Sequence, residues 1–198
     1  MSNLDLRMIK DTFSRLFVLA KQNKMNLEAF SISLLKSVFV EKMEDDKYDD
    51  YFNKSILDIF YDISGYQIDK DTSYGVFDDA FWSGSTYFEL HFILKKPFSY
   101  LFLKLPLPIM LDLYKVYHEM DISLMVNYFK NLEVKKTILK SLLEMSHSSI
   151  RKVSETTKIK ESTLNKYVSS DETLYNASFQ NINKLQKYFD VPYSLFIN

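Results

Sequence analysis

The chain has no cysteine, and its 198 residues include only three glycines and four prolines. Without cysteine it can form neither a disulfide nor a thiolate metal site. Because all-β folds need many turns, the scarcity of glycine and proline argues against them and favours helices. Sixteen Phe and 14 Tyr residues, within an apolar content of 46%, are enough to fill a core. We therefore expect an all-α protein.

A long uninterrupted apolar run is also missing. The most apolar region, residues 92–113, is interrupted by Lys95, Lys96, Lys104 and three prolines. A transmembrane helix needs about 20 consecutive apolar residues. Residues 1–7 lack the basic region followed by an apolar stretch that marks a signal peptide. We expect a cytoplasmic protein with no membrane partner.

The net charge is only −1, but the charges are unevenly distributed. Residues 134–198 hold ten Lys or Arg against six Asp or Glu, a net of +4. Residues 1–133 hold fifteen against twenty, a net of −5. The basic C-terminal region suits an anionic partner, whereas the acidic remainder would be repelled from DNA unless it faced away.

Apolar residues in the first half of the chain recur every three or four positions, which predicts amphipathic helices. The first helix buries Leu6, Ile9, Phe13, Leu16, Phe17 and Ala20. The second starts after Asn26, a candidate N-cap, and buries Leu27, Phe30, Leu34, Leu35 and Val38. A third contains Ile56, Leu57, Phe60 and Ile63 and ends near Gly65. These helices form a domain over residues 1–132.

Residues 77–94 predict a central buried helix with Phe77, Phe81, Trp82, Phe88, Phe92 and Ile93 in the core. Gly84 within it indicates close helix packing, because glycine costs a helix about 1 kcal/mol and needs another reason to be there. Pro108 suits the first turn of a helix that runs to about Tyr117. Asp121 caps another, with Leu124, Met125, Tyr128 and Phe129 on one face. The acidic segment 41–50 is either solvated or a patch for a basic partner, including DNA mimicry.

The second domain, residues 133–198, is expected to contain five short helices. The first four place Leu139 and Leu142, Ile150 and Val153, Leu164 and Tyr167, and Ile182, Leu185 and Phe189 in the core. Ser178 caps the fourth helix. Residues 191–196 form a closing helical turn. Between residues 149 and 167, two helical patterns are separated by a turn, as in a helix-turn-helix module.

The order and spacing of these apolar positions, from Leu139 to Phe196, resemble the Cro/repressor-like (XRE) helix-turn-helix superfamily. The segments 81–88, 105–114 and 117–122 resemble a bacterial family that joins a helical N-terminal region to an XRE-like domain. Its members are regulators in small operons similar to toxin–antitoxin loci. The resemblance implies a small repressor-like domain, double-stranded operator DNA as partner, and a cognate toxin or other protein for the N-terminal domain.

The helix-turn-helix segment departs from the XRE pattern at four positions. The turn carries Lys158 in place of a glycine with φ > 0. Lys160 stands at the N-cap of the recognition helix and cannot accept backbone N–H bonds. Ile150 starts the second helix, where a polar phosphate contact is usual, and Glu161 would repel phosphate. Together these changes suit a module that kept its fold and lost DNA affinity.

If the module binds DNA, its geometry identifies the contacts. Ser162, Thr163 and Lys166 point from the recognition helix toward base edges, and neighbouring Asn165 can pair with adenine. Arg151, Lys152 and Lys158 meet phosphates and set affinity and its salt dependence.

No pattern indicates an enzyme, a cofactor or a metal. The sequence has no glycine-rich phosphate loop, no Ser-centred elbow and no paired carboxylates. His91, His118 and His147 lack a second ligand at helical spacing, and a hydrogen-bonded helix corner is the expected role of His118.

The resulting functional prediction is a transcriptional regulator that binds operator DNA as a homodimer, because two half-sites multiply specificity. It would act as the antitoxin or regulator of a toxin–antitoxin-type operon. The alternative is a protein-binding inhibitor that uses its helical scaffold and acidic surface and whose helix-turn-helix no longer binds DNA. Charge reversal at Lys166 would abolish the first function. Charge reversal near Asp45–Asp46 or Asp49–Asp50 would abolish the second.

Overall fold

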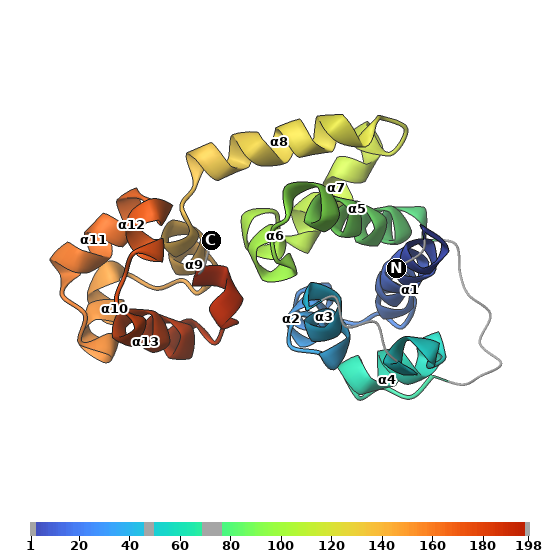
Figure 1. Ribbon diagram of the computed structural model, residues 1–198, viewed down its shortest axis with the longest axis horizontal. Helices are drawn as coiled ribbons and strands as arrows, with labels where there is room; N and C mark the ends of the chain where they lie inside the picture. The colour runs from blue at the N-terminus through green and yellow to red at the C-terminus, as the bar shows by residue number, and fades with distance from the viewer. Residues whose placement is uncertain (1–2, 46–49, 69–76, 197–198) are drawn as a thin grey trace. The chain divides into compact units, whose positions relative to one another are not determined.

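In the computed structural model, which describes residues 3–45, 50–68 and 77–196, every regular element within those ranges is a helix (Figure 1). The prediction of an all-α fold is confirmed. The chain forms two compact units, Met1–Asn127 and Tyr128–Asn198. Their boundary lies inside helix α8 (Ile122–Lys135), as does the predicted boundary at 132/133. Within the described ranges no helix is both long and apolar enough to cross a lipid bilayer.

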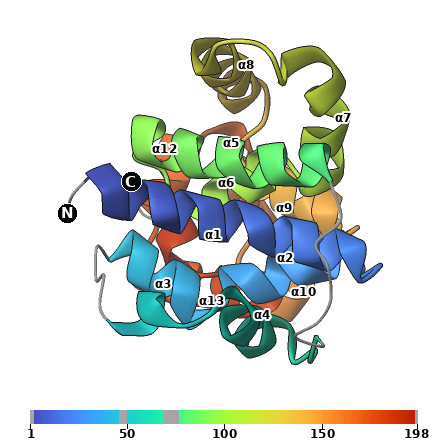
Figure 2. The ribbon, with the colours of Figure 1, turned by 90° about the vertical axis from the view of Figure 1, so that its right-hand side faces the viewer.

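The first unit consists of α1 (Asn3–Gln22), α2 (Leu27–Leu35), α3 (Val38–Glu44), η1 (Asp50–Asn53), α4 (Ile56–Ser64), α5 (Asp78–Leu94), α6 (Phe98–Lys104), α7 (Leu107–Tyr117) and the start of α8. Helices α1 and α5 pack lengthwise against each other at its centre (Figure 2). Phe13 and Phe17 on α1 and Tyr87 on α5 are fully buried between them.

Gly84 is what allows α1 and α5 to approach so closely. A Cβ atom at this position would lie 2.6 Å from the Cα of Ser14 and 2.8 Å from Cδ2 of Phe17. Because the nearer contact is with backbone, a larger residue would push the two helices apart. The prediction that Gly84 serves close helix packing is confirmed.

The residues predicted to start or end helices largely do so. Asn26 caps α2 by accepting a hydrogen bond from the Ala29 N–H at 2.9 Å. Gly65, in the left-handed conformation with φ 66°, ends α4. Pro108 lies in the first turn of α7, and Asp121 accepts from the Ser123 N–H at 2.8 Å.

Four apolar residues that the sequence places on core faces of this unit are exposed. Val38 is exposed because Ser37 starts a new helix there by accepting from the Val40 N–H, so the second predicted helix is two helices. Phe81 and Ile93 are exposed because α5 buries the face that carries Ala80, Gly84 and Tyr87. Leu124, predicted to share one face of α8 with Met125 and Phe129, is exposed, whereas those two residues are buried.

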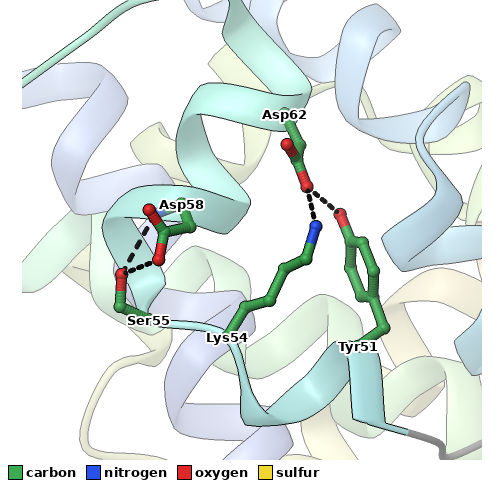
Figure 3. Close-up of polar contacts among 5 residues, drawn as sticks. All are labelled: Tyr51, Lys54, Ser55, Asp58 and Asp62. Carbon is green, nitrogen blue, oxygen red and sulfur yellow. Dashed lines mark hydrogen bonds and ion pairs between the residues drawn. The ribbon is translucent and has the colours of Figure 1, made fainter.

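A polar cluster joins η1 to α4 (Figure 3). Lys54 Nζ and the Tyr51 hydroxyl both donate to Oδ2 of Asp62, at 2.8 Å and 3.0 Å. The hydrogen bond from Lys54 is the main reason that the pKa of the Asp62 carboxyl is lowered. Of the acidic segment 41–50, residues 46–49 lie outside the described residues, so Asp46 and Asp49 have no structural account.

The second unit consists of the rest of α8, α9 (Ile138–Met145), α10 (Ile150–Thr157), α11 (Glu161–Ser169), α12 (Asp171–Tyr175), α13 (Phe179–Phe189) and η2 (Tyr193–Phe196). The predicted core is largely confirmed, since Leu139, Leu142, Val153, Leu164, Tyr167, Ile182 and Leu185 are buried. Ile150 and Phe189 are half-buried. Ser178 caps α13 as predicted. Helix α12 was not predicted.

Candidate nucleic-acid interface

Helices α10 and α11 are joined by three residues, 158–160, and the connection is fixed at its centre. Ile159 is buried, and its carbonyl oxygen accepts from Ser154 Oγ at 2.7 Å. Lys158 ends α10 in the left-handed conformation, with φ 59° and ψ 24°, and its N–H donates to the Ser154 carbonyl. A buried side chain and a capped helix end therefore hold the angle between the two helices.

The two lysines of this connection behave as the sequence predicts. Lys158 adopts the φ > 0 conformation that glycine adopts without strain. Lys160 precedes α11 and makes no side-chain capping bond. In contrast, Ser149 caps α10 by accepting from the Lys152 N–H at 3.2 Å. The start of α11 is thus the less stabilised of the two helix starts.

Helix α11 is anchored at its C-terminal end and on its inner face. The Thr137 hydroxyl, just before α9, donates to the Val168 carbonyl at 2.8 Å. On the inner face Leu164 and Tyr167 are buried, and the Tyr167 hydroxyl accepts from Asn181 Nδ2 of α13 at 3.0 Å. Contacts with two other helices therefore fix which face of α11 is turned outward.

The outward face of α11 carries four exposed polar residues, Ser162, Asn165, Lys166 and Ser169, which we call the α11 stripe. Residues three, four and seven apart lie on one face of a helix, so these four form a single row. Within the described part of the chain, the side chains of Asn165 and Lys166 have no hydrogen-bond or ion-pair partner. Ser169 Oγ donates to the Lys166 carbonyl at 2.8 Å, so the donors and the acceptor on the stripe that the fold leaves unused are those of Asn165 and Lys166.

The structure brings together three of the four residues that the sequence assigned to base edges. Ser162, Asn165 and Lys166 lie on the stripe, whereas Thr163 is half-buried on its flank. Ser169 belongs to the stripe and was missed. Its spacing of three residues from Lys166 was the signal that would have identified it.

The three predicted phosphate contacts are all exposed. Arg151 and Lys152 lie in the first turn of α10, and Lys158 lies in the connection. Arg151 Nε pairs with the Glu155 carboxylate at 2.9 Å, on a fully solvated face where such a pair adds little stability. Lys152 and Lys158 have no acidic partner among the described residues. The second unit, with eleven Lys or Arg against seven Asp or Glu, has a net charge of +4.

The histidines and acids do not assemble a metal centre in the described ranges, where no three His, Cys, Asp or Glu residues are placed to hold an ion. His118 makes a hydrogen bond within the C-terminal turn of α7, and its predicted role at a helix-to-helix corner stays a prediction. Its Nδ1 lies 2.8 Å from the Tyr114 carbonyl oxygen, which fixes Nδ1 as the protonated nitrogen.

Comparison with known proteins adds no further assignment. No family model, no curated protein and no solved structure matches the chain. The exposed residues of α10 and α11 therefore have to be interpreted from their own geometry and chemistry.

Proposed function

We propose that α10, residues 158–160 and α11 form a helix-turn-helix that binds double-stranded DNA, and that the protein is a transcriptional regulator. The observation that carries the proposal is the α11 stripe, an outward row of short polar side chains and one lysine on a helix anchored from behind. The major groove of B-DNA, about 12 Å wide, admits a single α-helix. Short side chains allow the helix axis to come close to the base edges.

The surrounding charges suit this placement. With α11 in the groove, the first turn of α10 would meet the phosphate backbone, as the first helix of such modules does. Lys152 and Lys158 would supply the phosphate contacts, with Arg151 available once its pair with Glu155 is exchanged for a phosphate. A homodimer would place two such units on an operator with two half-sites. The first unit would then sense a signal, dimerise or hold a partner protein such as the toxin of a toxin–antitoxin-type operon.

The test is binding of the purified protein to the DNA upstream of its own gene, measured by fluorescence anisotropy at two salt concentrations. The Lys166→Glu variant should lose sequence-selective binding, because a carboxylate on the stripe repels both phosphates and base acceptors. Lys187→Glu is the matched control, with the same charge change in the last turn of α13. Equal, weak binding of the wild type to the operator and to a scrambled duplex would refute the proposal.

A second candidate function is protein binding by the first unit, and the outer face of α7 favours it. Ile109 and Val116 lie seven residues apart on that face and are 47% and 56% exposed. Apolar side chains that share one solvated helix face suit contact with another protein. If the protein is an inhibitor with a remnant helix-turn-helix, Val116→Asp should abolish its activity and Lys166→Glu should be silent. If the protein is a regulator, Lys166→Glu should abolish the control of transcription and Val116→Asp should leave it unchanged.

A further inference from the structure

We infer that α11 reads an adenine through Asn165, so that each half-site of the bound DNA carries an A·T pair at one fixed position. The inference rests on the proposed function and adds to it the base that the protein selects.

Asn165 has an unused amide at the middle of the α11 stripe. It is exposed, and within the described residues its side chain makes no hydrogen bond. Two other asparagines of the same unit are used by the fold. Asn176 Nδ2 donates to the Glu172 carbonyl and Asn181 Nδ2 donates to the Tyr167 hydroxyl, each at 3.0 Å. Asn165 therefore keeps both its donor and its acceptor for a ligand.

The carboxamide of asparagine matches only one base in the major groove. Adenine presents an acceptor, N7, beside a donor, the N6 amino group, and a carboxamide can bond to both at once. Guanine presents two acceptors, thymine one acceptor and a methyl group, and cytosine one donor. An asparagine on the α11 stripe, with its carboxamide unused by the fold, therefore discriminates in favour of adenine.

The neighbours of Asn165 reinforce this choice. Ser162 and Ser169, one turn before and after it, are short, so the equally short asparagine can reach the base edge. Glu161, exposed and four residues earlier, adds a negative charge that repels the two acceptors of guanine and favours the amino groups of adenine and cytosine. Helix α11 has no arginine, which is the usual reader of guanine.

The experiment is selection of binding sites from a random duplex pool by the full-length protein, followed by affinity measurements on the selected duplex. Replacing the selected adenine with any other base should weaken wild-type binding roughly 5- to 150-fold, the usual range for one bidentate base contact. In Asn165→Asp the amide donor becomes an acceptor. The variant should lose its preference for adenine at that position and prefer cytosine, whose amino group donates.

Asn131→Asp is the control, because it makes the same charge change at an exposed position of α8, outside the α11 stripe. It should weaken binding to all duplexes alike and keep the preference for adenine. A selected motif whose base preferences are unchanged in Asn165→Asp overturns the inference and leaves DNA binding intact. Failure of the wild type to bind or enrich any duplex overturns the proposed function, and the inference with it.

Discussion

At the scale of single residues, the informative positions are those where the side chain works against the local structure. Among the residues that the structure describes, five non-glycine residues have positive φ: Lys24, Lys95, His147, Lys158 and Asp190. This conformation costs an ordinary residue roughly 1–2 kcal/mol, and glycine adopts it freely. Lys158 is the one that lies between α10 and α11, where the proposed interface needs positive charge.

Lys158→Gly should therefore separate stability from binding. We expect the variant to unfold at a higher denaturant concentration than the wild type. Its free energy of unfolding should rise by roughly 0.5–1 kcal/mol, after the greater entropy of glycine in the unfolded chain is counted. Its affinity for operator DNA should fall and its salt dependence should become shallower by one phosphate contact. Urea unfolding and anisotropy on the same sample measure both effects.

His147→Gly provides the comparison, because His147 has φ 49° in the same unit but lies between α9 and α10. It should gain similar stability and keep its DNA affinity. If both variants bind DNA like the wild type, Lys158 makes no phosphate contact.

Glu44 gives a prediction about pH. Burial raises the pKa of its carboxyl above the ordinary value of 4.5, although the Phe98 N–H, which donates to Oε1 at 2.6 Å, partly lowers it. A raised pKa means that the folded state holds the proton more tightly than the unfolded state. The stability that this group contributes is therefore present below about pH 4.5 and is lost as the pH rises through the folded pKa. Glu44→Gln keeps an oxygen that can accept from the Phe98 N–H but cannot ionise. The variant should therefore not lose stability as the pH rises, and it should be more stable than the wild type at neutral pH.

Asp62 provides the opposite case for the same measurement. Since Lys54 lowers its pKa, its contribution is present above the unfolded pKa and is lost as the pH falls through the folded one. The unfolding free energy, measured by denaturation between acid and neutral pH, should no longer fall at acid pH through this group in Asp62→Asn. The decrease toward neutral pH that comes from Glu44 should remain in that variant. If Glu44→Gln instead follows the wild type at every pH, the carboxyl is solvated in the folded state.

At the scale of elements, the contact between α1 and α5 is the most constrained in the first unit. Gly84→Ala should destabilise the protein by about 1–3 kcal/mol, although alanine is the better helix former by about 1 kcal/mol. The cause is the Cβ atom that would lie 2.6 Å from the Ser14 Cα. Ser85→Ala, on the next and half-exposed position of α5, should gain slightly from helix propensity. Equal unfolding midpoints for the two variants would show that α1 can move away at no cost.

The same scale shows what the sequence could predict. Helices with a clear apolar spacing, such as α1, α4 and α13, were predicted with their core faces. The break between α2 and α3 was missed because Leu34, Leu35 and Val38 continue the helical spacing through the new cap at Ser37. The buried face of α5 was misassigned because aromatic residues occur on all sides of this helix. Packing against α1 buries the side that carries Gly84. For α11 the pattern was enough to place Ser162, Asn165 and Lys166 outward, whereas the burial of Thr163 depends on neighbouring helices.

At the scale of the whole molecule, the two units carry opposite charge. Residues 1–127 hold 14 Lys or Arg against 19 Asp or Glu, a net of −5, whereas residues 128–198 have a net of +4. Long-range electrostatics act on association with DNA over a Debye length of about 10 Å at 0.1 M salt. The first unit should therefore oppose the DNA binding that we propose for the second.

A fragment of residues 121–198, which keeps all of α8, tests this opposition. It has eleven Lys or Arg and eight Asp or Glu, a net of +3, against −1 for the full chain. On a short duplex with one half-site, where dimerisation does not contribute, the fragment should bind more tightly than the full chain at low salt. The difference should shrink as salt rises, because screening removes the repulsion and leaves the contacts of α11 unchanged. Circular dichroism would verify that the fragment is helical. Weaker binding of a folded fragment at every salt concentration would mean that the first unit itself contacts the DNA, in spite of its charge.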